Sequence, residues 1–380
     1  MAELVARFHP RLEEIDAGAW NALLPDDNPF LDHAFLSGLE IHGCLSTRYG
    51  WQPYHLGLYD NGKLVAAAPL YVKTNSHGEY VFDWSWASAY ERHGLDYYPK
   101  LLCAVPYSPV TGPRLLARAG DEALRAALRD TIRDAAENAQ WSSAHLNFAA
   151  PADAAIFAGR REWLPRFDWQ YHWRNRGWRD FGDFLEALTS KKRKNIRQER
   201  AHVARSGISC EVLHGDEIGE TDWRLLHGFY RRTFMEKGNH AALTFAFFRH
   251  LGLAMPRRVL GVFARHGNRT VAAALLLRSR DTLYGRYWGA SEDVPGLHFE
   301  VCYYQGIDYC LRNGMSVFEP GAQGEHKLAR GFLPTRTDSF HFIADERFRA
   351  AIADALANEA HVLETYRAEL MQHSPYASAS

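Results

Sequence analysis

A strand–turn–strand block occurs twice in this chain, once in each half. The first copy covers His55–Val72 and the second covers Leu260–Leu277. Both have Leu-Gly near the start, an Asn-Gly or Gly-Asn turn in the middle, and Val-Ala-Ala-Ala in the second strand. Such a turn between apolar strands is typical of a β-hairpin. A repeat separated by this much sequence predicts two similar domains rather than a solenoid of short units.

The elements after each hairpin are expected in one order: strand, helix, strand, loop. In the first half they are Tyr80–Trp86, a helix near Tyr97–Ala104, a strand at Val105 and the loop Pro109–Pro113. In the second half they are Tyr284–Trp288, Leu297–Arg312, and the strand Val317–Glu319 with its loop. We therefore predict an α+β fold with mixed central sheets and flanking helices. The expected divisions are residues 1–165, residues 166–344, a C-terminal helix over 345–371 and a disordered tail over 372–380.

The charge balance and the cysteines exclude several classes of protein. Lys and Arg total 44 against 45 Asp and Glu, which argues against a general nucleic-acid coat. The 5 cysteines include no Cys-x-x-Cys pair, so we expect reduced thiols, a cytoplasmic location and no metal site. The apolar runs are too short to span a bilayer, and the N-terminus lacks the apolar core of a signal peptide.

A basic stretch between the two repeats reads as one helix. It begins near Ser190 and ends at Gly207. Helical spacing places Arg193, Arg197 and Arg200 on one face, where they can bind a phosphate-bearing donor. A solvated basic face is the alternative interpretation.

The stretch Val317–Pro334 concentrates groups that transfer protons or stabilise charge. A short apolar strand runs into a glycine-rich loop that carries Glu319, Gln323, Glu325, His326, Lys327 and Arg330. A polar surface turn after a buried strand is the other interpretation of this pattern.

Several motifs resemble the Fem-type ligases, which use aminoacyl-tRNA to build peptidoglycan cross-bridges on a tandem GNAT (acyl-CoA N-acyltransferase) fold. The matching stretches are Leu188–Arg197 with Ser206-Gly207, Tyr287–Ala290, Leu311–Gly321 and His326–Phe332. A bacterial group described as FemAB-like predicted N-acyltransferases is more similar still, through Asn28–Leu31, Gly50–Pro53 and Glu319–Lys327. The resemblance covers nearly the whole chain and implies two tandem GNAT-like domains.

Amide-forming acyl transfer needs a base for the amine, a group that stabilises the oxyanion and an acid for the leaving group. At the end of its strand, Glu319 can be the base, directly or through water, and the alternative is a carboxylate that only bonds the Gly321–Gly324 backbone. Lys327 resembles the Fem-type lysine near the transferred carbonyl, although a surface salt bridge with Glu325 is the alternative. His326 can act as acid or base, and Gln323 and Arg330 can contact the donor.

Substrate-binding residues are expected in both repeats. Fem-type enzymes bind the acceptor in a groove between repeats, and the resemblance implies that such a groove is lined by the residues Asp83, Trp84, Tyr287 and Trp288. Lys237 and His240 can flank its entrance. Aromatic strand residues are more often part of the core, and a loop at the end of a helix explains Lys237 and His240 equally well.

These observations predict an N-acyltransferase that joins an activated acyl or aminoacyl group to an amine, without a permanently bound cofactor. No Gly-rich pyrophosphate loop follows either central strand, which disfavours acetyl-CoA and favours aminoacyl-tRNA or an unusual acyl donor. The alternatives are an acyl-CoA-dependent GNAT enzyme acting on a small amine, and a non-catalytic module that recognises a peptidoglycan precursor or peptide. Oligomeric state is not predicted.

Overall fold

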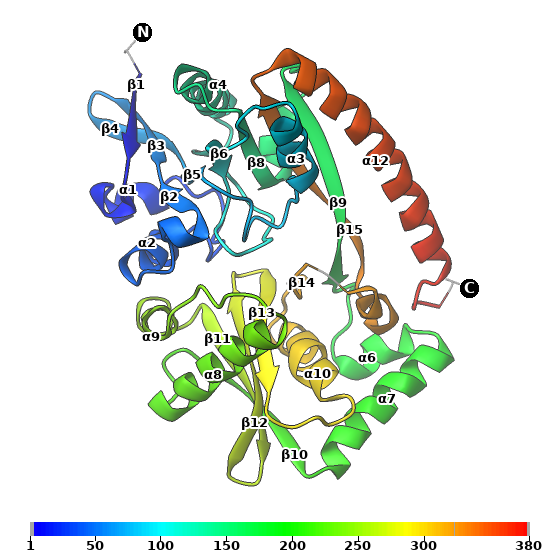
Figure 1. Ribbon diagram of the computed structural model, residues 1–380. Coiled ribbons are helices and arrows are strands. Elements are labelled where there is room, and N and C mark those ends of the chain that lie inside the picture. Colours follow the sequence, from blue (N-terminus) through cyan, green and yellow to red (C-terminus); the bar gives the residue numbers. More distant parts are fainter. Residues whose placement is uncertain (1–3, 323, 378–380) are drawn as a thin grey trace. The chain divides into compact units, whose positions relative to one another are not determined.

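The computed structural model describes residues 4–322 and 324–377, which divide into two compact units. The first consists of residues 1–169 and 336–366, and the second of residues 170–335 and 367–380 (Figure 1). The chain therefore leaves the first unit near the expected boundary at residue 165, but residues 336–344 return to the first unit rather than ending the second. Within the described residues, no helix has the length and apolar character needed to cross a bilayer.

Two sheets and their helices build the first unit. One sheet has the order β1-β3-β4-β7 and is antiparallel, with strands Val5–His9, His55–Asp60, Lys63–Ala68 and Leu116–Ala117. The other has the order β15-β8-β6-β5-β2, with strands Leu333–Ile343, Ser143–Ala149, Lys100–Cys103, Leu70–Lys73 and Trp51–Pro53. In the second sheet, β6 and β8 are parallel.

The helices of this unit are α1 Ala17–Asn21, α2 His33–Ile41, α3 Trp84–Arg92, α4 Glu122–Asn138, α5 Pro151–Ile156 and α12 Glu346–Gln372, whose end continues into the second unit. Helix α4 illustrates how the sequence pattern determines where a helix begins and which face it buries. Asp121 accepts a hydrogen bond from the Leu124 N–H at 3.0 Å and caps the helix. Leu128 and Ile132 then lie on one face and join the core beneath both sheets.

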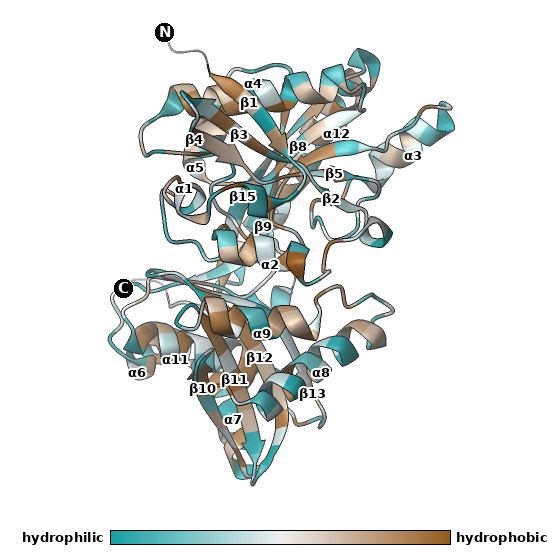
Figure 2. Ribbon diagram, turned by 90° about the vertical axis from the view of Figure 1, so that its left-hand side faces the viewer, coloured by the Kyte–Doolittle hydropathy of each residue, from teal (hydrophilic) through white to brown (hydrophobic). Residues whose placement is uncertain are grey.

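The second unit holds a sheet of order β10-β11-β12-β13-β14-β9. Its strands are Ile208–His214, Val259–His266, Arg269–Arg278, Thr282–Ala290, Val317–Glu319 and Trp163–Arg174. The pair β13–β14 is parallel and the others are antiparallel. Figure 2 shows the apolar strands β11 and β12 in brown, in keeping with their buried side chains.

The helices of the second unit are α6 Phe181–Glu186, α7 Ser190–Arg205, α8 Glu220–Glu236, α9 Phe245–Ala254, α10 Leu297–Phe299, the π-helix η3 Glu300–Tyr304, α11 Gln305–Arg312 and the 3-10 helix η4 Glu325–Arg330. Helix α8 packs on β12 and β13, and α11 packs on β13 and β14. The residue that caps α7 is Thr189, one position before the expected Ser190.

The predictions for the second repeat are confirmed and several for the first are wrong. The hairpins, β13, the helix from Leu297 and the strand Val317–Glu319 all form as expected. In the first unit, however, the expected strand Tyr80–Trp86 does not form: residues 80–83 are a loop, and α3 begins at Trp84. Tyr97–Ala104 contains strand β6 instead of a helix, and Val105 is in no strand. The loop is flanked by the carboxylates of Glu79 and Asp83, and both are buried in ion pairs with Lys100, an arrangement that a pattern of apolar residues does not reveal.

The strand of the first unit that corresponds to β14 is also not the expected strand at Val105. Helix α4 precedes β8, so β8 corresponds to β14, and the loop after Val105 does not. Beyond the end of β6, Gly112 occupies the position beside β8 that a longer β6 would fill, and it forms a parallel bridge to Ala149. The buried Arg114 side chain donates to the carbonyls of Asn147 at 3.0 Å and Val110 at 2.5 Å. The space between the parallel strands is therefore filled in the first unit.

The segment after α12, for which composition predicts disorder, makes defined contacts as far as Ala377. The Thr189 N–H donates to the Pro375 carbonyl at 2.9 Å, and the Ala377 N–H donates to the Ala187 carbonyl at 3.0 Å. The Tyr376 hydroxyl donates to the Gly331 carbonyl at 2.7 Å. These bonds attach the segment to the connection between α6 and α7 and to the end of η4.

Gly306 tests how closely α11 must approach β14. A Cβ there would lie 2.3 Å from the ring of the fully buried Phe318, whereas Gly228 on α8 has open space around it. We expect Gly306→Ala to lower the free energy of unfolding by about 1–3 kcal/mol through overpacking. Gly228→Ala should raise it by about 0.5–1 kcal/mol through helix propensity. Urea unfolding of both variants would test this, and equal effects would contradict the packing argument.

Candidate active site in the second unit

The candidate site lies where two parallel strands separate. Strand β14 pairs with β13 for three residues, ending with Tyr284 opposite Glu319. There β14 stops at Pro320, while β13 continues to Ala290. The opening forms a cavity of about 60 Å³ lined by Ala274, Leu276, Gly285, Arg286, Tyr287, Trp288, His298, Cys302, Tyr303 and Pro320. The carboxyl ends of a parallel strand pair therefore face a small pocket. Ligands commonly bind at such strand ends in α/β sheets.

Lys327 is buried beside this opening. Its side chain is fully enclosed, and its Nζ donates to the Gly321 carbonyl at 2.8 Å. Burial lowers the pKa of Lys327 to about 7, and the Arg286 guanidinium lowers it further against the opposing effect of Cys302. The alternative of a surface salt bridge with Glu325 is therefore wrong.

Glu319 and Arg286 come from the paired ends of the two strands. Glu319 is 8% exposed, and its Oε2 lies 3.9 Å from Nη2 of Arg286. The Nη1 of Arg286 also donates to the Gly285 carbonyl at 2.7 Å. A guanidinium can hold a carboxylate or an anionic substrate group at this position. Sequence reasoning missed Arg286, since it stands within a strand that reads as aromatic core.

Two histidines and a tyrosine line the other side. The Tyr303 hydroxyl and His326 Nε2 are hydrogen-bonded at 2.8 Å, and the ring of His298 lies 4.5 Å from that of Trp288. Burial lowers the pKa of His298 to about 4, with further lowering by His326 and Arg330. Burial and the neighbouring Lys327 and Arg330 also lower the pKa of His326. Burial and the neighbouring cations therefore favour the neutral form of both rings.

The π-helix η3 explains how this side is built. Its wider turn lets two successive side chains, Tyr303 and Tyr304, both be buried while reaching different partners. Tyr303 contacts His326, and the Tyr304 hydroxyl donates to Glu199 on α7. Single π-turns inside helices occur frequently at functional sites.

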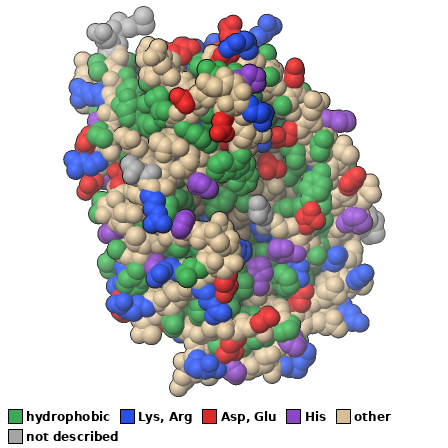
Figure 3. All heavy atoms as spheres, in the orientation of Figure 1, with side chains coloured by type: hydrophobic (Ala, Val, Ile, Leu, Met, Phe, Trp, Pro, Cys, Tyr) green, Lys and Arg blue, Asp and Glu red, His purple; other side chains and the backbone are tan. Residues whose placement is uncertain are grey.

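Two of the arginines predicted to bind the donor serve instead to tie helices together. Arg330 Nη2 pairs with Glu199 at 2.6 Å, and its guanidinium lies 3.3 Å from the centre of the Phe299 ring. Arg200 donates twice to Glu300 at 3.1 Å. The side chains that remain open on α7 line a shallow depression made by Ser190, Arg193, Lys194, Arg197, Gln198, Ala201 and Arg205. Elsewhere Lys/Arg and Asp/Glu are interspersed on the face in Figure 3.

The other predicted residues divide between the two units. Tyr287 and Trp288 line the pocket, and Lys237 and His240 are exposed after α8. Gln323 lies outside the described residues. Asp83 and Trp84 belong to the first unit, where Asp83 is bound to Lys100 in a buried ionic network and Trp84 is 42% exposed beside His77. The described residues include no group of three or more His, Cys, Asp or Glu side chains that can hold a metal ion.

Comparison with known proteins assigns the chain to a family. A family described as peptidoglycan biosynthesis/recognition, FemAB-like, matches residues 11–378. The chain belongs to the FemAB-like family. No curated protein matches it in sequence.

Solved structures with the same fold include FemX, at 10% identity and a TM-score of 0.52 over 92% of this FemAB-like chain and 100% of FemX. They also include the C-terminal domain (DUF2156) assigned to a lysylphosphatidylglycerol synthetase from Agrobacterium fabrum, at 13% identity and a TM-score of 0.54 over 91% and 96% of the two chains. A tandem GNAT protein from the clavulanic acid biosynthesis pathway matches at 12% identity and a TM-score of 0.46, over 90% and 99%. At such identities the matches to FemX and to the DUF2156 domain speak to fold alone, and the fold is α+β in two units.

The lowered pKa of Lys327 gives a prediction for stability. Between about pH 7 and the ordinary lysine pKa of 10.5, the unfolded chain keeps this proton and the folded chain releases it. Because the unfolded state then binds more protons, the free energy of unfolding rises with pH in this window. Relative to Lys327→Met, the wild type should gain roughly 1–3 kcal/mol between pH 7 and 9.5. Denaturant unfolding at both pH values measures this gain, and a difference that does not change with pH would contradict it.

Proposed function

We propose that this FemAB-like protein is an N-acyltransferase that uses the pocket of the second unit to form an amide between an activated acyl or aminoacyl group and an amine. The observation that carries the proposal is the buried Lys327, held at the end of a separating parallel strand pair with Glu319 and Arg286. Membership in a family described as peptidoglycan biosynthesis/recognition supports a cell-wall precursor as the acceptor.

The reaction needs three proton or charge movements. The acceptor ammonium first loses a proton, and its lone pair forms a C–N bond to the carbonyl carbon of the donor. The carbonyl oxygen then bears a negative charge. Collapse of this tetrahedral intermediate breaks the bond to the donor oxygen or sulfur, and the leaving group takes up a proton.

The side chains in the pocket and beside it match these needs: Arg286 lines the pocket, and Glu319, His326 and Lys327 lie next to its lining residues. The Lys327 ammonium stabilises the oxyanion, because a cation in a buried site acts far more strongly than in water. The Glu319 carboxylate accepts the amine proton, and Arg286 positions that carboxylate. His326, which is bonded to Tyr303, receives the proton that Glu319 took from the amine and passes it to the leaving group.

Variants of Lys327 and Glu319 test these roles. With radiolabelled aminoacyl-tRNA as donor and UDP-N-acetylmuramoyl pentapeptide as acceptor, Lys327→Ala and Glu319→Gln should each lower the rate of amide formation about 100-fold or more. The exposed Lys63→Ala in the first unit is the control and should keep the wild-type rate. Full activity in both site variants would show that the site is misplaced.

The pH dependence separates two roles for Lys327. If its ammonium is required, the rate falls as pH rises through about 7, where the side chain loses its proton. Lys327→Arg keeps the positive charge, so its alkaline limb should move to higher pH. A rate that rises through pH 7 in the wild type would instead make Lys327 the base.

The basic depression on α7 supports aminoacyl-tRNA as the donor. A polyanion bound there would release counterions, so its affinity should fall steeply with salt. We expect the double variant Arg193→Glu/Arg197→Glu to weaken tRNA binding at least tenfold and to flatten its salt dependence. Arg160→Glu, on an exposed turn of the first unit, is the matched control. A salt-independent affinity measured by filter binding, or acetyl-CoA turnover without tRNA, would favour the acyl-CoA alternative.

The family description also includes recognition, which favours a second candidate function. In that case the chain would bind a cell-wall precursor without transferring a group. Mass spectrometry after incubation with each donor decides between the two, because a recognition module would show acceptor binding and no mass increase.

A further inference from the structure

A second small cavity lies entirely within the first unit and has no part in the site described above. Its volume is about 60 Å³, and the loop Tyr80–Phe82 forms one wall. Phe148 and Phe167 add two further aromatic walls. Arg166, Asp168 and Glu359 supply the charged groups, with hydroxyls from Thr337 and Ser339. The lining thus combines apolar faces with a few polar groups, as ligand pockets do.

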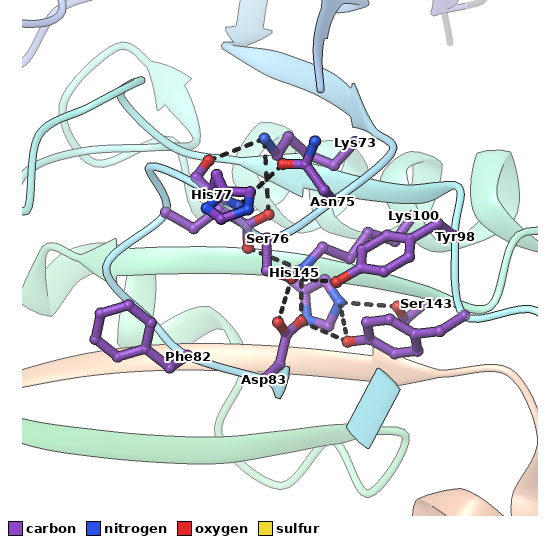
Figure 4. A network of polar contacts seen from close by, with 12 residues as sticks. Lys73, Asn75, Ser76, His77, Phe82, Asp83, Tyr98, Lys100, Ser143 and His145 are labelled. Carbon is purple, nitrogen blue, oxygen red and sulfur yellow. Dashed lines mark hydrogen bonds and ion pairs between the residues drawn. The ribbon is translucent and has the colours of Figure 1, made fainter. Parts of the chain in front are cut away.

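A single buried lysine fixes the loop wall at both ends. Figure 4 shows Lys100 close to Ser76 and Asp83. Its Nζ donates to Glu79 at 2.8 Å, to Asp83 at 2.5 Å and to Ser76 at 3.0 Å. These three bonds use all the donors of the ammonium group. Since Glu79 and Asp83 flank Tyr80–Phe82 directly, the wall is held in place before any ligand arrives.

Two of the aromatic residues that line the cavity have an unfavourable backbone conformation. Tyr80 has φ of 62° and Phe148 has φ of 56°, in a region that bulky residues rarely adopt. Each costs roughly 1–2 kcal/mol and persists only where the surroundings enforce it. Here the strain presents both rings to the cavity, so the fold accepts an energetic penalty to shape this lining.

The charges of the cavity do not balance. Arg166 pairs with both oxygens of Glu359, at 2.8 and 3.1 Å, and also donates to the Phe82 carbonyl at 2.8 Å. Asp168 receives the N–H of Trp169 on one oxygen. Burial raises the pKa of Asp168, against the lowering effects of the Trp169 N–H and Arg166. The lining therefore carries two carboxylates and one guanidinium. A second guanidinium, that of Arg336, stacks on the Phe167 ring but is paired with Asp338 and is not part of the lining. The surplus negative charge of the lining favours a cation.

We propose that this cavity binds a small primary amine as its ammonium ion. The ammonium group lies against Asp168, and the short alkyl chain packs between the rings of Phe82, Phe148 and Phe167. Aromatic faces attract cations as well as alkyl groups, so both parts of the ligand are matched. An anion of the same size meets the surplus carboxylate and is rejected. The proposal does not depend on acyl transfer in the second unit.

The test uses the full-length protein and n-butylammonium as the probe, with butyrate and n-butanol as matched anionic and neutral probes. Titrations followed by NMR should give saturable binding of n-butylammonium in the millimolar range, as expected for a ligand of five heavy atoms. The shifts should include residues of the cavity wall. Butyrate should bind at least tenfold more weakly.

Two variants locate the site without threatening the fold. Asp168→Asn keeps the oxygen that receives the Trp169 N–H and should weaken binding about fivefold or more. Phe82→Ala removes a ring that is 50% exposed and should weaken it about threefold or more. The controls are Asp96→Asn and Leu95→Ala, which change exposed residues outside the cavity and should leave binding unchanged. Wild-type binding in Asp168→Asn, equal binding of butyrate, or no binding of n-butylammonium would each overturn the proposal.

Discussion

The parallel pairing of β13 with β14 for only three residues is the constraint on which the candidate site depends. Hydrogen bonds hold the strands together as far as Tyr284 and Glu319. Beyond that point Pro320 has no N–H to continue the ladder, and Gly321, at φ 95°, turns the chain away. The buried Lys327 then donates to the Gly321 carbonyl, which would otherwise lack a strand partner. One short pairing thus places a carboxylate, a loop and a cation around one small opening.

The first unit shows what happens when the same opening is filled. Its parallel pair β6–β8 also ends early, but Gly112 continues the ladder in place of β6, and Arg114 bonds the carbonyls around it. The guanidinium is fully buried and engaged with backbone, so it is part of the core. Two copies of one topology therefore differ at the position where a pocket can form. The unit with the open pair is the one that holds the candidate catalytic residues, which supports a division into one catalytic and one supporting unit.

The local sequence pattern was sufficient to predict most helices and strands of the second unit. In the first unit it mispredicted several elements, and the reason is physical. Val317–Glu319 and the hairpins follow from apolar alternation and Asn/Gly turns, which act over a few residues. The loop of residues 80–83 is held by ion pairs to Lys100, a residue distant in sequence, and buried ion pairs leave no periodic signal. The same limit hid Arg286 and Tyr303, whose neighbours are apolar. Lys327 was found through resemblance to Fem-type enzymes, whereas its burial and its bonds to loop carbonyls required the structure.

Two buried lysines show how one side chain can be made structural or reactive. Burial lowers the pKa of Lys100, but Glu79 and Asp83 more than offset this and raise it. Lys100 therefore stays a cation and serves as a fixed link between segments of the chain. Lys327 is equally enclosed, but its hydrogen-bond partners are neutral carbonyls and its charged neighbour is Arg286. Its proton is consequently held weakly near neutral pH. A lysine with a purely structural role at this position would be expected to pair with a carboxylate, as Lys100 does. The described contacts of Lys327 include no such pair. This difference favours a chemical role for Lys327 over a structural one.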